Sequence, residues 1–81
     1  MSEAPSVSLY DIHQSAYLAL HGIEPTLANQ GTTIVFEFCP SEKVYALLRE
    51  YKENPSVNIL DFVSCLRKLR ARILAQRGGA R

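Results

Sequence analysis

The chain lacks most of the residue patterns that mark a specialised site. Its 81 residues include no tryptophan, only two cysteines and only four glycines, two of them close to the C-terminus. None of the glycines forms a run that cradles a phosphate group, and no stretch approaches the roughly 18 apolar residues that a membrane-spanning helix requires. We therefore expect no nucleotide-binding loop, no cofactor and no association with a membrane.

The cysteines and histidines do not form a metal-binding motif. Cys39 and Cys65 lie far apart, and His13 and His21 are separated by about 12 Å along a helix axis. No pair has the spacing of about two to five residues that zinc sites use, so exposed histidines and a buried Cys65 are the simpler interpretation. Cys39 stands before a proline where a helix begins, which favours a thiolate, but the sequence brings no histidine toward it. We expect neither a metal centre nor an enzyme.

The composition predicts one small folded domain. Hydrophobic residues make up 47% and charged residues 21% of the chain, close to globular averages, which argues against a disordered protein. We place the domain at residues 6–77 and expect flexible ends at residues 1–5 and 78–81, where small, polar and glycine residues are concentrated. The first fifteen residues show no basic start followed by a long apolar run, so we expect a cytoplasmic protein with reduced thiols.

Local patterns predict three strands and three helices in the order β-α-β-β-α-α. Residues 7–9 alternate in the manner of a short strand. A capping box formed by Asp11 and Gln14 then predicts the start of a helix over about 11–21. Gly22 suits the left-handed position that ends such a helix.

The strongest strand signal is residues 32–38, in which β-branched and aromatic residues predominate. Residues 23–29 are predicted to be the hairpin partner of this strand, with the turn near Gly31. Because proline cannot donate a hydrogen bond to a ladder, Pro25 indicates that the partner is an edge strand.

Two further helices complete the predicted fold. Ser41 is typical of a helix start, Pro55 follows the end of that helix, and the longest helix is expected at about 58–76. The fold class is therefore α+β, a small antiparallel β-hairpin sheet of two or three strands packed with three helices. The predicted core consists of Ile12, Ala16, Leu20, Ile34, Phe36, Phe38, Val44, Leu47, Leu48, Phe62, Leu66, Leu69 and Ile73.

The charge of the chain is distributed unevenly. All eight acidic residues lie at or before position 61, and six of the nine basic residues lie in the last fifteen. Residues 1–61 carry 3 − 8 = −5 and residues 62–81 carry +6, although the whole chain has a net charge of only +1. Binding of a polyanion must therefore depend on the local basic run. The candidate partner-binding residues in this run are Arg67, Lys68, Arg70, Arg72 and Arg77.

The basic run admits two interpretations. On an amphipathic helix these cations flank the apolar stripe as two basic edges, an arrangement that suits a phosphate backbone. Alternatively, they complement the helix dipole, which contributes about 0.3 to 1 kcal/mol, while their stems cover the edges of the core. No helix-turn-helix is evident, and the spacing of the four tyrosines suits helices packed on a sheet better than base stacking.

Three segments in a fixed order resemble a known family. Residues 15–22 (SAYLALHG), 35–38 (VFEF) and 66–73 (LRKLRARI) are similar in order and spacing to a small bacterial family catalogued only as a domain of unknown function. The resemblance covers about positions 9 to 74. It implies a short chain with an alanine-rich helix ending in glycine, a hairpin ending in a phenylalanine strand, and a basic terminal helix. It implies no activity.

The sequence thus favours a non-enzymatic binding or assembly module whose basic C-terminal helix contacts an acidic partner, either protein or nucleic acid. The alternative is a homodimeric structural protein with that helix in the interface. Either the basic helix of one copy pairs head to tail with the acidic part of the other, or two such helices pack antiparallel through leftover apolar positions such as Leu60, Leu66 and Leu74. A domain of this size buries roughly 60 to 65% of the surface that its unfolded chain exposes, so a partner subunit would stabilise it.

Overall fold

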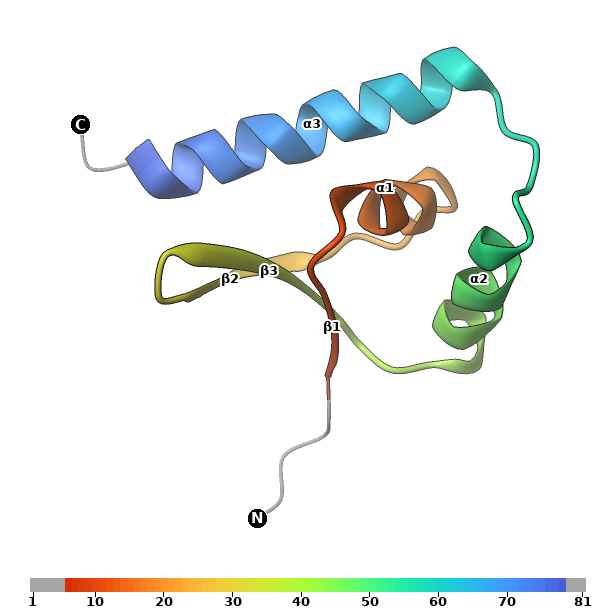
Figure 1. The fold of residues 1–81 in the computed structure, drawn as a ribbon, viewed down its shortest axis with the longest axis horizontal. Helices are drawn as coiled ribbons and strands as arrows, with labels where there is room; N and C mark the ends of the chain where they lie inside the picture. The colour runs from red at the N-terminus through yellow and green to blue at the C-terminus, as the bar shows by residue number, and fades with distance from the viewer. Residues whose placement is uncertain (1–5, 79–81) are drawn as a thin grey trace.

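The structure, a computed structural model, describes residues 6–78 and consists of one three-stranded sheet and three helices (Figure 1). This is an α+β fold, and its element order β-α-β-β-α-α confirms the prediction. The expected flexible ends, residues 1–5 and 79–81, lie outside the described residues, whereas Gly78 is the last residue of the final helix. The elements are β1 (Val7–Leu9), α1 (Ile12–Leu20), β2 (Thr26–Gln30), β3 (Thr33–Phe38), α2 (Glu42–Lys52) and α3 (Ile59–Gly78).

The helix boundaries follow from capping side chains. A carboxylate oxygen of Asp11 accepts a hydrogen bond from the backbone N–H of His13 at 2.8 Å, which caps α1. The hydroxyl of Ser41 accepts one from the N–H of Val44 at 3.1 Å and caps α2 in the same way. At the other end of α1, Gly22 has φ +88° and the next N–H bonds back to Leu18, as in a Schellman motif.

The sheet has the strand order β1-β3-β2, with both pairs antiparallel. Gln30 pairs with Thr33, so Gly31 and Thr32 form a two-residue hairpin turn, in which Gly31 has φ +62°. The hairpin partner begins at Thr26, directly after Pro25, and lies at the edge of the sheet as predicted.

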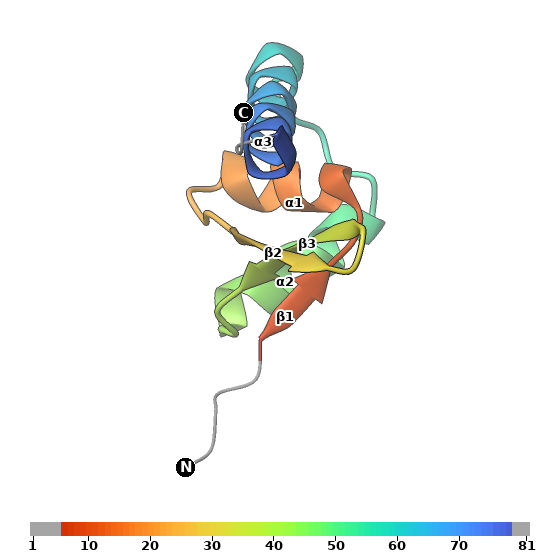
Figure 2. The ribbon, with the colours of Figure 1, turned by 90° about the vertical axis from the view of Figure 1, so that its left-hand side faces the viewer.

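The elements form three layers, with α1 between the sheet and α3. Figures 1 and 2 both show α3 lying across α1 on the side away from the sheet, while α2 lies beside α1 at one end. The main-core cluster joins all of these elements. It consists of Ala16, Tyr17, Leu18, Phe36, Phe38, Val44, Leu47 and Leu69.

The predicted core was right in outline but omitted the buried residues Tyr17, Leu18 and Val35. Tyr17 and Leu18 are 3% and 0% exposed, because α1 is covered by the sheet on one side and by α3 on the other, whereas the prediction assumed a single apolar face. Val35 is also 0% exposed, although it faces away from Phe36. Several predicted core residues are only partly buried, namely Ile12, Leu20, Leu48, Phe62, Leu66 and Ile73.

A side-chain bridge crosses the sheet face that carries Val35. The hydroxyl of Tyr10, which follows β1, donates to the side-chain carbonyl of Gln30 in β2 at 3.0 Å. Because β3 lies between these two strands, the bridge spans it on the face that alternation assigns to Val35. The open face of the sheet is therefore partly closed by a residue outside the strands.

Candidate binding surface on helix α3

Helix α3 has one buried side, and this fixes which of its residues point outward. Leu69 is 1% exposed, and Phe62, Leu66 and Ile73 pack partly buried against the same core. These positions follow the helical period, so they occupy one side of the helix, toward α1. In Figures 1 and 2 no other element lies beyond α3, so its opposite side faces outward.

Four of the five candidate cations lie on the exposed part of α3. Arg67, Lys68, Arg70 and Arg77 are all exposed, and within residues 6–78 none of them forms an ion pair or a side-chain hydrogen bond. α3 contains only one acidic residue, Asp61, which lies in its first turn. With five basic residues against one acidic residue, the helix carries 5 − 1 = +4.

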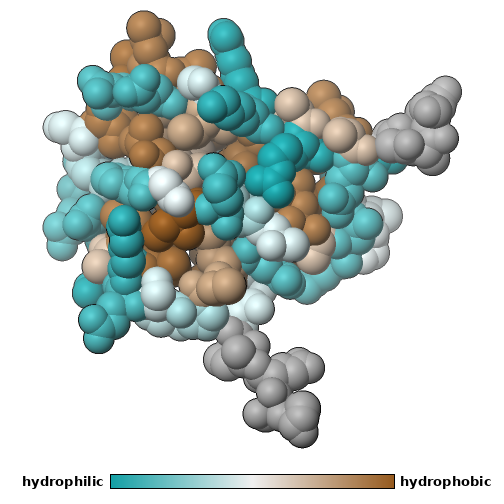
Figure 3. Space-filling model, turned by 180° about the vertical axis from the view of Figure 1, so that it is seen from behind, coloured by the Kyte–Doolittle hydropathy of each residue, from teal (hydrophilic) through white to brown (hydrophobic). Residues whose placement is uncertain are grey.

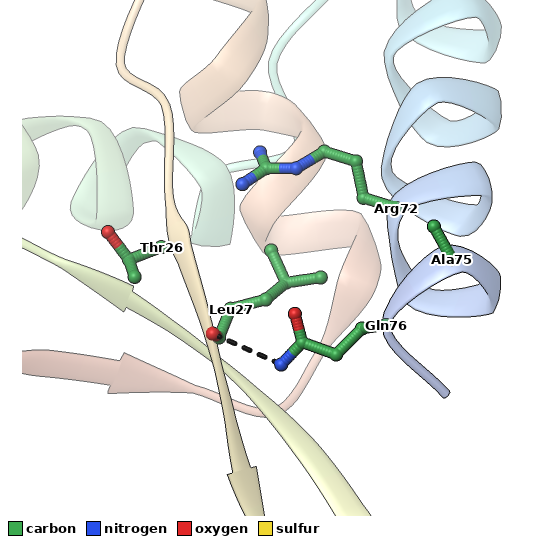
Figure 4. A pocket seen from close by; sticks show the side chains of 5 residues that line it. All are labelled: Thr26, Leu27, Arg72, Ala75 and Gln76. Carbon is green, nitrogen blue, oxygen red and sulfur yellow. Dashed lines mark hydrogen bonds between the residues drawn. The ribbon is translucent and has the colours of Figure 1, made fainter. Parts of the chain in front are cut away.

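The fifth candidate, Arg72, is engaged within the chain. Its Nη2 donates to the backbone carbonyl of Pro25 at 3.0 Å, and its Nη1 lies 3.6 Å from a carboxylate oxygen of Glu24. Figure 4 shows the Arg72 side chain reaching from α3 across to the segment that leads into β2. Arg72 therefore attaches the helix to the domain, and we set it apart from the four outward cations.

Gln76 makes a second attachment one turn further along α3. Its Nε2 donates to the carbonyl of Leu27 at 3.3 Å, the contact drawn in Figure 4. Four residues of helix rise by about 6.0 Å and two residues of strand by about 6.7 Å. The spacing of Arg72 and Gln76 along the helix is therefore close to the spacing of the two carbonyls that they contact. These are the carbonyls of Pro25 and Leu27, which point outward from the edge of the sheet. These two contacts occupy part of an edge that would otherwise be open to another chain.

Sequence reasoning missed Gln76, and no local signal identifies it. The contact joins residues that are 49 positions apart, and glutamine on a helix is usually solvated. The spacing of Arg72 and Gln76, one helical turn apart, is compatible with a shared neighbour but does not specify one.

Two apolar side chains accompany the outward cations. Leu60 is 79% exposed and Leu74 is 69% exposed, at opposite ends of α3, whereas Leu66 belongs to the core contact. Figure 3 shows hydrophobic and hydrophilic patches alternating along the upper rim of the molecule, where α3 lies. The outward side of α3 is therefore of mixed chemistry, not uniformly basic.

The histidines and cysteines of the chain have different surroundings in the structure. His13 Nδ1 lies 3.3 Å from a carboxylate oxygen of Asp11. Within residues 6–78 there is no group of three His, Cys, Asp or Glu side chains that suits a metal ion. Cys39 is exposed and Cys65 is half-buried, and both are free thiols. Among the described residues no helix is long and apolar enough to cross a membrane.

An aromatic group beside α2 is built around Tyr17. Its hydroxyl donates to a carboxylate oxygen of Glu50 at 2.9 Å, and its ring meets the His21 ring edge-on with centroids 4.8 Å apart. Burial, and after it the hydrogen bond and charge of Glu50, raise the pKa of Tyr17 above its ordinary value of 10.0. A hollow of about 460 Å³ beside it is lined mainly by apolar side chains, including Val57 and Phe62. This group joins α1 to α2.

These features define a small α+β domain whose longest helix presents basic side chains outward. The chain belongs to the family described as domain of unknown function (DUF5659), whose family model matches residues 7–75. The match extends from β1 through most of α3 and confirms the family expected from the sequence. A search of curated proteins and a search of solved structures each found no significant match.

Proposed function

We propose that this chain is a non-enzymatic binding or assembly module that contacts an acidic partner, protein or nucleic acid, through the outward side of α3. The observation that carries the proposal is that only one of the cations on α3 is engaged within the described part of the chain. Arg72 is engaged with Pro25 and Glu24, while Arg67, Arg70 and Arg77 remain exposed without a described internal partner.

The attachment of α3 to the domain supports the same proposal. Leu69 is buried in the core, and Arg72 and Gln76 hold the C-terminal half of the helix to the edge of the sheet. The backbone that carries the outward cations is therefore already ordered. A preorganised surface loses less conformational entropy on binding than a helix that must first form.

The alternative function, a homodimer with α3 in the interface, is opposed by charge. Each α3 carries +4, so two copies packed through their outward sides would bring cations against cations. An acidic partner relieves this repulsion, whereas a second copy packed through the outward side of its own α3 increases it. We also propose the cytoplasm as the place of action, because both cysteines are free and Cys39 is exposed.

The test is a fluorescence titration of labelled duplex DNA, single-stranded RNA and polyglutamate with the purified protein. Four phosphate contacts give duplex DNA a slope of about −3.6 in log K against log salt, so binding should weaken roughly 150-fold between about 50 and 200 mM salt. The variant R67A/R70A/R77A should lose binding to whichever polyanion the wild type prefers.

The matched control removes the same number of positive charges from α2. Lys43, Arg49 and Lys52 are also exposed, so K43A/R49A/K52A changes the net charge equally but leaves α3 intact. Retained binding in this control, together with loss in the α3 variant, supports the proposal. Equal loss in both variants, or no binding by the wild type at about 50 mM salt, contradicts it. Sedimentation of the wild type tests the homodimer alternative separately, since a monomer excludes it.

A further inference from the structure

The outward side of α3 carries a row of residues at the spacing that packed helices use. Leu60, Ser64, Arg67, Ala71 and Leu74 recur at intervals of four, three, four and three residues. At about 100° per residue they lie within about 80° of one another on the helix surface. All five are exposed, on the side opposite the buried face of the helix. We call this row the outer seam.

The composition of the outer seam suits a second helix laid along it. Its two ends are the leucines, which are 79% and 69% exposed, and the alternating four-three spacing is that of the contact row in paired helices. Ser64 and Ala71 are small, so they allow another backbone to approach closely between the leucines. The leucines are 14 residues apart, which is about 21 Å along the axis.

The residues that flank the outer seam determine which helix can bind there. In paired helices the flanking positions select the partner through charge. Here these positions include Lys68 on one side and Arg70 and Arg77 on the other, with Asp61 as the single acidic residue. A bound helix therefore needs acidic residues along both of its own flanks.

Arg67 favours a foreign helix over a second copy of α3 as the bound partner. It is the third of the five residues and lies at the centre of the outer seam, so both a parallel pair and a centred antiparallel pair of α3 helices place Arg67 against Arg67. Two like charges desolvated together are strongly unfavourable, whereas the long Arg67 side chain can reach a carboxylate on the flank of a foreign helix and form an ion pair with it.

We propose that the outer seam docks one amphipathic helix of a partner protein, about 15 to 21 residues long, with leucine or alanine along its contact row and aspartate or glutamate on both flanks. This inference rests on the proposed function and narrows the acidic partner to a protein helix. Charge complementarity selects the acidic flanks. The exposed Leu60 and Leu74 favour a protein over nucleic acid, because a phosphate backbone offers no apolar surface to either of them.

The test is a fluorescence anisotropy titration with a labelled 21-residue peptide that has leucine along its contact row and glutamate at the flanking positions. Its own glutamates repel one another, which keeps the peptide from pairing with itself. One control peptide has glutamine at the flanks, and a second has serine in place of leucine. We expect each control to bind at least about tenfold more weakly than the glutamate–leucine peptide.

On the protein, L60S/L74S should weaken binding of the glutamate–leucine peptide by at least about tenfold. Because both leucines are exposed, this variant should melt like the wild type, which circular dichroism checks. Tyr45→Ser is the matched control, since Tyr45 is an exposed apolar residue on α2 and should leave binding unchanged.

The outcomes separate this inference from the function on which it rests. Binding that depends on the glutamates, on the peptide leucines and on Leu60 and Leu74 establishes the helix-docking seam. If duplex DNA binds in a salt-dependent manner and the peptide does not, the inference is overturned while a polyanion-binding function stands. If the peptide binds but L60S/L74S binds it equally well, the seam is not the site. If neither probe binds, both proposals fail.

Discussion

Replacement of Arg72 by alanine should destabilise the domain, whereas replacement of the neighbouring outward cation Arg70 should not. Arg72 donates to the carbonyl of Pro25 at 3.0 Å and lies 3.6 Å from Glu24, while Arg70 has no described internal partner. The two residues stand on the same helix and have the same charge and helix propensity. The comparison therefore isolates the contact to the sheet edge from the effect of removing a positive charge.

The expected magnitude follows from the two contacts. A hydrogen bond from a charged group contributes about 1.5 to 3 kcal/mol, and partial exposure of the Arg72 side chain, 43%, reduces that figure by roughly half. The exposed pair with Glu24 contributes about 0 to 1 kcal/mol. We expect Arg72→Ala to lower the free energy of unfolding by about 1 to 2 kcal/mol and Arg70→Ala to change it by less than about 0.5 kcal/mol.

The assay is thermal and urea unfolding followed by circular dichroism. For a domain of 60 to 100 residues, about 1 kcal/mol lowers the Tm by roughly 4 to 8 °C, so the loss in Arg72→Ala is easily resolved. Equal melting of the two variants would refute the reasoning, because it would mean that the contact with Pro25 contributes nothing to holding α3 in place.

Three other substitutions test the fold. Phe36→Ala removes a ring that is 2% exposed in the central strand and should cost about 3 to 5 kcal/mol, enough to abolish cooperative unfolding; an unchanged Tm would show that β3 is not central. Gly31→Ala should lower the free energy of unfolding in urea by about 1 to 2 kcal/mol, because φ is +62° at this position. The added methyl group meets no atom within 4 Å, so the loss would come from the backbone conformation alone. An unchanged free energy of unfolding would contradict the positive φ in the turn. The raised pKa of Tyr17 favours its neutral form in the folded state, so stability is full below about pH 10 and falls as the pH rises through the raised pKa. Urea unfolding of Tyr17→Phe should show a shallower fall above pH 10 than the wild type, and parallel curves would contradict this assignment.

The sequence predicted those elements whose signals are local. Asp11 and Ser41 cap the helices that they were expected to cap, and Gly31 lies in the predicted hairpin turn. Each of these features depends on residues within about five positions of one another. A side chain that competes for a neighbouring backbone N–H acts in the same way in most folds.

The burial of Tyr17, Leu18 and Val35 was harder to predict because it depends on where distant elements pack. A second layer over α1 becomes visible only when α3 is in place. The continuous apolar run that contains Tyr17 and Leu18 is nevertheless a signal, since a helix that is apolar on all sides is buried on all sides. Val35 lies in an apolar run with Ile34 and Phe36, and such a run is the corresponding signal that a strand residue is buried on the second face as well.

The sequence was sufficient to identify the group of cations on α3. It was not sufficient to show which of them contacts the domain and which remain exposed. All five basic residues have similar sequence surroundings, and only the packing of α3 against the edge of the sheet distinguishes Arg72 from the others. The same packing exposes Leu60 and Leu74 while it covers Leu66. Contacts with distant elements determine which side of a helix is buried. The sequence of the helix itself shows only the periodicity of its apolar residues.

The most direct test of the account is to map binding residue by residue with amide NMR spectra of the labelled protein during titration with the glutamate–leucine peptide. The account predicts that the largest shift changes fall on the outward residues of α3, from Leu60 to Arg77, and vanish at high salt. Changes concentrated on α2 or on the open face of the sheet, or no changes at about 50 mM salt, would contradict the central claim that the outward side of α3 is the binding surface.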